Sequence, residues 1–255
     1  MRLTEMTTVP PQLAFEPVGL DAVAPGLTSG EVQVWLLPLN GPPVALARLM
    51  ETLDPEEQAR AERLGRRVDQ QAFVAAHGLT RLLLARALGA EPAELRFQTG
   101  PHGKPRLSGR TMPWFNLAHS GEWALLAISP DAEVGVDLEE MRDLPDLENV
   151  ATAHFAPGEL AALARLDPAL RRDAFYACWT RKEAHVKALG LGLLAELDRF
   201  EVSLDPGAAP AVLSIDGSAK AAEGWQLCAF QPVAGFWACV AIEWPHVAFR
   251  GFRLA

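Results

Sequence analysis

The sequence contains few cysteines and no apolar run long enough to cross a bilayer. Its three cysteines, Cys178, Cys228 and Cys239, lie far apart and form no CxxC pair, which fits neither a disulfide framework nor a zinc knuckle. No apolar segment approaches the ~20 residues that span a bilayer, and none follows Arg2 near the N-terminus. We therefore expect a soluble, unexported cytoplasmic protein with no membrane partner.

Basic residues are also outnumbered. The chain has 23 Lys and Arg against 32 Asp and Glu, a formal charge of −9. Nucleic-acid-binding proteins hold phosphate backbones with clustered Lys and Arg, so this balance argues against a nucleic-acid partner. The remaining composition, 49% hydrophobic and 22% charged over 255 residues, is that of a globular protein with one large domain or two small ones.

The pattern along the chain predicts an α+β fold in two similar halves. Residues 1–30 are rich in Pro and Gly and predict an irregular leader. The first half, 31–130, contains a strand, a helical stretch, a strand that enters a turn, and a hairpin, at residues 32–39, 54–88, 96–107 and 114–129. The second half, 131–255, contains a strand, two helices and three further strands, at residues 133–139, 157–166, 168–189, 200–204, 225–230 and 236–244. Since binding sites commonly form between domains, residues near the seam at Asp131 are of most interest.

Two acidic residues share one face of the strand EVGVDLE. Alternation places Val134, Val136 and Leu138 on one side and Asp137 with Glu139 on the other. Mg²⁺ prefers one or two carboxylates together with water and substrate phosphate, so this spacing suits a hard cation. A strand with a solvated acidic face explains the same pattern.

The helix predicted at 168–189 ends at Gly190. It carries Trp179, Glu183 and Lys187 at intervals of four residues, which places them in a row. An apolar anchor, an acid and a base therefore line one side. An exposed Glu–Lys pair is the alternative interpretation.

Two turns carry residues suited to anions. GPHGKPRL places Lys104 in a Gly and Pro turn, and NLAHSG places His119 and Ser120 at a hairpin tip. Lys binds phosphate as a point charge and His donates from either ring nitrogen, so both turns could meet a pyrophosphate. Such residues also occur in turns without any ligand.

Taken in order, GKPRL, FNLAHS, GVDLE and WTRKEAHVKALGLGL resemble the successive signature blocks of the 4′-phosphopantetheinyl transferase superfamily. The order of the blocks is typical of the surfactin-synthetase-activating type. The resemblance implies a single chain whose two α/β halves form an intramolecular pseudo-dimer, and a monomer. It also implies a Mg²⁺-dependent enzyme, with Mn²⁺ as a substitute, that uses coenzyme A and an apo acyl or peptidyl carrier protein.

The resemblance also implies roles for individual residues. Asp137, Glu139 and Glu183 would bind Mg²⁺, and three gathered carboxylates would need such a cation to offset their repulsion. The residues that would contact coenzyme A are Lys187 at the phosphates, Lys104 and Pro105 at the nucleotide end, His119 and Ser120 at a phosphate, and Lys182.

The implied reaction is attack by a carrier serine on the β-phosphorus of coenzyme A, which releases adenosine 3′,5′-bisphosphate. Catalysis would use Asp137, Lys187 and Glu183, with Glu183 or a water it holds as the base. Ala118, Ala72 and His77 depart from the family pattern, because relatives often have Ser or Arg there. Arginines at 66, 67 or 81 would then supply the grip on the 3′-phosphate.

Two other functions use the same residues. One is a different magnesium-dependent phosphoryl enzyme, such as a phosphatase or nuclease, although the sequence has no second metal cluster and no motif for a dedicated nucleophile. The other is a non-catalytic module that binds coenzyme A or a carrier protein. Loss of an acid would favour such a module, yet all three are present.

Overall fold

The computed structural model describes residues 12–22, 25–192 and 195–254. The strands are β1 (Phe15–Val18), β2 (Glu31–Pro38), β3 (Phe97–Thr99), β4 (Pro105–Leu107), β5 (Trp114–Ser120), β6 (Trp123–Ser129), β7 (Val134–Glu140), β8 (Phe200–Val202), β9 (Val212–Ile215), β10 (Trp225–Phe230), β11 (Phe236–Glu243) and β12 (Ala248–Leu254). The α-helices are α1 (Pro43–Thr52), α2 (Pro55–Glu62), α3 (Arg67–Leu88), α4 (Leu147–His154), α5 (Pro157–Arg165) and α6 (Pro168–Leu189). Among the described residues, no helix combines the length and apolar character needed to cross a bilayer.

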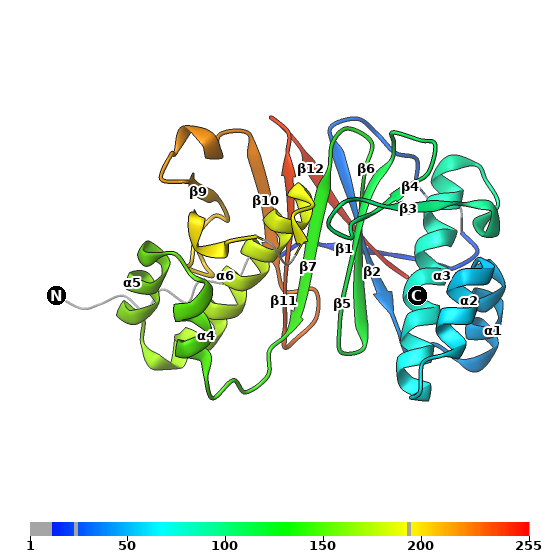
Figure 1. Ribbon diagram of the computed structural model, residues 1–255, viewed down its shortest axis with the longest axis horizontal. Coiled ribbons are helices and arrows are strands. Elements are labelled where there is room, and N and C mark those ends of the chain that lie inside the picture. Colours follow the sequence, from blue (N-terminus) through cyan, green and yellow to red (C-terminus); the bar gives the residue numbers. More distant parts are fainter. Residues whose placement is uncertain (1–11, 23–24, 193–194, 255) are drawn as a thin grey trace.

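The two predicted α/β halves are present, arranged as four layers. A five-stranded sheet of order β1-β12-β2-β6-β5 lies beside a three-stranded sheet of order β10-β11-β7, with α1–α3 on one outer side and α4–α6 on the other (Figure 1). Alternate residues of β7 face the other sheet, where Val134, Val136 and Leu138 pack against Val34 and Ala127. The strand alternation predicted for β7 is therefore confirmed on its apolar side.

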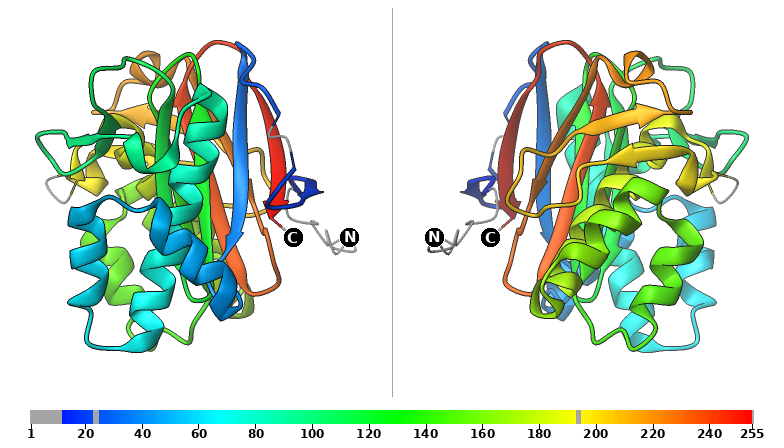
Figure 2. Two further views of the ribbon diagram at one scale, coloured as in Figure 1. Left: turned by 90° about the vertical axis from the view of Figure 1, so that its right-hand side faces the viewer. Right: turned by 90° about the vertical axis from the view of Figure 1, so that its left-hand side faces the viewer.

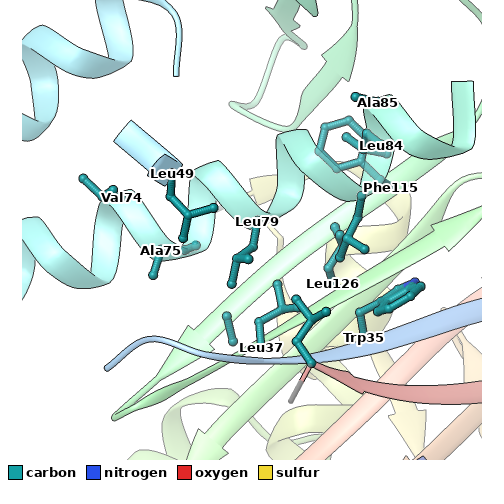
Figure 3. Close-up of a cluster of buried hydrophobic side chains, with 14 of the residues drawn as sticks. Trp35, Leu37, Leu49, Val74, Ala75, Leu79, Leu84, Ala85, Phe115 and Leu126 are labelled. Carbon is teal, nitrogen blue, oxygen red and sulfur yellow. The ribbon is translucent and has the colours of Figure 1, made fainter. Parts of the chain in front are cut away.

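A second core fills the space between α1–α3 and the five-stranded sheet. Leu49 of α1 and Leu79 of α3 meet Leu37 and Leu126 of the sheet, with Trp35 and Phe115 nearby (Figure 3). This layer is built from the helical period of α3 and the period of two in β2 and β6. It fixes the outer surface of β5, which contributes to the site.

Local signals set the helix ends as predicted. Asp54 caps α2, accepting hydrogen bonds from the backbone of Glu56 and Glu57. Gly89 ends α3 and Gly190 ends α6, both in the left-handed conformation that glycine adopts without strain. The stretch 54–88 is two helices, α2 and α3, because the chain turns between Arg63 and Arg66.

The long-range strand pairings differ from the sequence prediction. Within the predicted leader, β1 is a strand that pairs in parallel with β12, and the first eleven residues, including Arg2, lie outside the described part. Strand β12 also pairs in parallel with β2, so the end of the chain belongs to the sheet of the first half (Figure 2). The boundaries at residues 31–130 and 131–255 therefore follow the order of the chain but not the sheets.

Candidate functional site

Strands β5 and β7 lie side by side where the two sheets meet (Figure 1). They belong to different sheets, and polar side chains bridge them. The backbone N–H of Val136 donates to Asn116 Oδ1 at 2.8 Å, and that of Glu140 donates to Ser120 Oγ at 3.1 Å. The two sheets therefore meet at β5 and β7, where side chains of β5 accept hydrogen bonds from the backbone of β7.

Helix α6 packs closely on β7 because Gly135 has no side chain. A Cβ at this position would collide with the carbonyl oxygen of Ala184 and the backbone N–H of Ala188. Gly135 of the GVDLE block is therefore a packing residue. The close approach brings the Glu183 and Lys187 side of α6 against Asp137.

The acids and Lys187 interact across this contact. The ammonium of Lys187 lies 2.5 Å from Asp137 Oδ1, and the Asp137 side chain is almost fully buried. Burial raises the pKa of Asp137 even against the attraction of Lys187. Burial and the Asp137 charge raise the pKa of Glu183, and raise that of Glu139 to about 7. For Lys187, burial is outweighed by the surrounding carboxylates, so its pKa is raised.

These residues suit a divalent cation, although they do not already form a ligand cage. Among the described residues, no three His, Cys, Asp or Glu side chains are grouped as a metal site. Asp137 Oδ2 is nevertheless buried and has no hydrogen-bond partner in the part of the chain that the structure describes. Carboxylates that raise one another's pKa are the donor set that a hard cation relieves. Asp137, Glu139 and Glu183 could therefore hold Mg²⁺.

A cleft lies beside one face of β5. Phe115, Leu117 and His119 share one face of the strand, and the first two line a cavity of about 240 Å³ that also includes Pro105 and His77. Burial and the charges of His77 and Lys187 lower the pKa of His119. His119 therefore lies between the cavity and the carboxylates.

His77 is a cleft residue that the sequence prediction left without a role. Its Nδ1 lies 3.0 Å from Glu57 Oε1, and its ring stacks on Phe73 with centroids 4.0 Å apart. Arg60, whose guanidinium lies over the same Phe73 ring, also lines the cavity. The sequence signal for this pair was the spacing of four residues between Phe73 and His77, which places both rings on one side of a helix.

The comparisons with known proteins agree with this geometry. A model of the 4′-phosphopantetheinyl transferase superfamily matches residues 133–236, and a model of the N-terminal region of 4′-phosphopantetheinyl transferases matches residues 42–131. The 4′-phosphopantetheinyl transferase HetI of Nostoc sp. is 36% identical over 219 residues, 85% of this chain and 89% of HetI. The chain belongs to the 4′-phosphopantetheinyl transferase superfamily.

The similarity to two other relatives extends over a smaller part of this chain. The 4′-phosphopantetheinyl transferase Sfp of Bacillus subtilis is 30% identical over 157 residues, 62% of this chain and 69% of Sfp. The 4′-phosphopantetheinyl transferase AcpT of Salmonella typhi is 43% identical over 110 residues, 43% of this chain and 56% of AcpT. With family membership shown, the transferase is an enzyme of the surfactin-synthetase-activating type.

Two lysines of the transferase lie elsewhere than the resemblance implies. Lys182 is fully buried and donates to Glu159 Oε1 at 2.8 Å and to the Phe200 carbonyl at 2.7 Å. The structure therefore holds the Lys182 ammonium in the core of the second half, away from the position that the resemblance implies for a contact with coenzyme A. Lys104 is also buried and bonds to Glu133, so its ammonium is not free at the nucleotide end.

Ser120 and the arginines need further corrections. Ser120 points to β7 and donates to Glu139 Oε2 at 3.3 Å, so its hydroxyl orients a carboxylate rather than standing free in the cleft. Arg81 is buried against Asp54 and Glu57, so it is unavailable to a phosphate.

Arg66 and Arg67 are both exposed. Arg66 lies 3.4 Å from Asp69. Arg67 lines a separate hollow with Leu46 and Met50, and neither arginine lines the 240 Å³ cavity. The signature block that ends at Leu193 runs beyond the described residues by that one position.

Proposed function

We propose that this enzyme transfers the 4′-phosphopantetheine arm of coenzyme A to a serine of an apo acyl or peptidyl carrier protein. The reaction would depend on Mg²⁺, or Mn²⁺ in its place, and release adenosine 3′,5′-bisphosphate. One observation carries the proposal: Asp137, Glu139 and Glu183 interact around Lys187 where α6 packs on β7. Because one chain contains both halves, we propose that it acts as a monomer. The three free cysteines favour a reducing compartment, so we also propose that it acts in the cytoplasm.

Coenzyme A would lie along the cleft. Its nucleotide end fits the 240 Å³ cavity beside Pro105 and His77, whose walls combine apolar rings with polar groups. Its pyrophosphate would then reach His119, which can donate a hydrogen bond from its ring, and the ammonium of Lys187. This orientation presents the β-phosphorus to the seam, where an acceptor serine enters from solvent.

The proposed chemistry is a displacement at that phosphorus. The serine oxygen forms a new P–O bond while the bond to the bridging oxygen breaks, and adenosine 3′,5′-bisphosphate leaves. Lys187 would offset the charge that develops on the phosphates. Glu183, or a water that it holds, would take the serine proton, since this carboxylate would lie close to the incoming hydroxyl. Mg²⁺ held by the three acids would neutralise the pyrophosphate when bound.

Intact-protein mass spectrometry tests the proposal. The enzyme is incubated with Mg²⁺, coenzyme A and an apo carrier protein, and the released nucleotide is identified by chromatography. We expect the carrier to gain one phosphopantetheine mass and adenosine 3′,5′-bisphosphate to appear in equal amount. Hydrolysis of coenzyme A without a mass gain would favour a phosphatase. Binding of coenzyme A without turnover would favour a non-catalytic module.

A further inference from the structure

Lys104 joins three elements across the seam. It lies in the turn between β3 and β4 in the first half, and its ammonium reaches into the second half. It donates to the Val134 carbonyl at 3.0 Å, where β7 begins, and to the Ala188 carbonyl at 3.1 Å, in the last turn of α6. Its third contact is Glu133 Oε2, at 2.5 Å.

These contacts use the whole hydrogen-bonding capacity of the side chain. A lysine ammonium has three donors and no acceptor, and Lys104 has three acceptors within hydrogen-bond distance. Its side chain is only 7% exposed. A phosphate could recruit this ammonium only by taking it from Glu133 or from one of the two buried carbonyl oxygens, and a buried carbonyl without its donor is costly.

The turn around Lys104 also touches the end of α6 through backbone atoms, as Figure 1 shows where the loop between β3 and β4 approaches that helix. Gly192, with a positive φ of 60°, packs so closely on the His102 carbonyl that a Cβ would lie 2.7 Å from it. The stem of Lys104 lies beside Gly190, the residue that ends α6. The two glycines of this block thus allow the turn to cover the end of the helix.

We propose that Lys104 is a positioning residue for the reaction, which clamps the end of α6 to the start of β7. The inference deepens the proposed function and rests on it. Lys187 precedes Ala188 by one residue in α6, and Asp137 follows Val134 by three residues in β7, so both partners of the ion pair at the site lie on the segments that the clamp joins. Lys104 therefore acts through Lys187 and Asp137 and leaves the nucleotide to other residues.

Two measurements separate a clamp from a nucleotide contact. Hydrogen exchange reports on the last turn of α6, where the amides of Gly190 and Leu191 both donate to the Val186 carbonyl. Calorimetry with adenosine 3′,5′-bisphosphate reports on the nucleotide subsite alone. In Lys104→Met we expect these amides to exchange about tenfold faster. We expect the bisphosphate affinity to change by no more than about twofold, and kcat for transfer to fall about 10- to 100-fold.

Arg106→Met is the matched control, because Arg106 also pairs with Glu133 but is half-exposed and, among the described residues, forms no hydrogen bond or ion pair with α6. We expect it to leave exchange and affinity unchanged. A tenfold loss of bisphosphate affinity in Lys104→Met, with wild-type exchange at Gly190 and Leu191, would overturn the proposal. If Lys104→Met does not fold, Glu133→Gln decides by the same two readouts, with a smaller increase in exchange expected. If wild-type enzyme does not bind the bisphosphate, the proposed function fails, and exchange alone still decides on the clamp.

Discussion

The ammonium of Lys187 lies 2.5 Å from one carboxylate oxygen of Asp137, while the other oxygen is buried with no hydrogen-bond partner within residues 12–22, 25–192 and 195–254. The ion pair therefore provides a partner for only one of the two carboxylate oxygens. A buried oxygen without a donor is costly unless a ligand completes its shell. A bound cation is the ligand that the proposal assigns to this oxygen.

Asp137→Asn tests this pair directly. The variant keeps the shape of the side chain but removes the charge, so we expect transfer to fall by about 10²- to 10³-fold. The change removes a buried charge, whose pKa burial raises, but also takes a partner from Lys187, whose pKa Asp137 raises against burial. These two effects oppose each other, so we expect little net change in the melting temperature. Rates and melting curves are compared with Glu140→Gln on the same strand. A stable Asp137→Asn enzyme at the wild-type rate would exclude a catalytic charge here.

Gly135→Ala tests whether the close contact of α6 with β7 is required. The added methyl group meets backbone atoms of Ala184 and Ala188, which cannot move aside alone. We expect the free energy of unfolding to fall by about 3 kcal/mol or more, with loss of transfer. Gly65→Ala is the control, since nothing lies within 4 Å of its Cβ position. Equal stability of the two variants in denaturant titrations would contradict the packing.

Glu57 makes stability depend on acid pH. Burial acts to raise its pKa, but hydrogen bonds and charges from His77 and Arg81 outweigh burial and lower it from 4.5. Since the folded pKa lies below the unfolded one, Glu57 stabilises the fold above about pH 4.5 and loses this contribution as the pH falls further. In Glu57→Gln, we expect unfolding free energy to fall less steeply between about pH 5 and 3. Glu62→Gln, an exposed change on the same helix, should keep the wild-type slope.

Lys182→Met tests the corrected role of that lysine. The change leaves the buried Glu159 carboxylate without its cation, so we expect unfolding free energy to fall by about 3–5 kcal/mol. Adding Glu159→Gln removes the stranded charge and should restore part of the loss. The double variant should bind coenzyme A normally in calorimetry. Wild-type stability of Lys182→Met together with weakened coenzyme A binding would restore a ligand role.

Much of the site could be predicted because its signals are local. The alternation of β7 is enough to place Val136 and Asp137 on opposite faces, and the spacing of four puts Glu183 and Lys187 on one side of α6. Gly190 marks the end of that helix. Strand and helix periods depend only on neighbouring residues, so these predictions needed no tertiary information.

The buried lysines could not be placed from the sequence. A lysine in a signature block looks the same whether it meets a phosphate or a carboxylate, and the partners of Lys104 and Lys182 lie 29 and 23 residues away. Strand β12 was missed for a similar reason. It pairs in parallel with β1 and β2, far away in sequence, and parallel pairing has no turn to mark it. Helix α1 was missed although Pro43 stands at its start.

We propose that Glu183, together with Asp137 and Glu139, makes this fold a cation-dependent phosphopantetheinyl transferase. The most direct test is a time course of carrier-protein mass, with coenzyme A and increasing Mg²⁺, for wild-type enzyme and Glu183→Ala. We expect the wild type to load the carrier at a rate that rises with Mg²⁺, and the folded variant to load none in the same period. Loading by Glu183→Ala at the wild-type rate would contradict this role of the three acids.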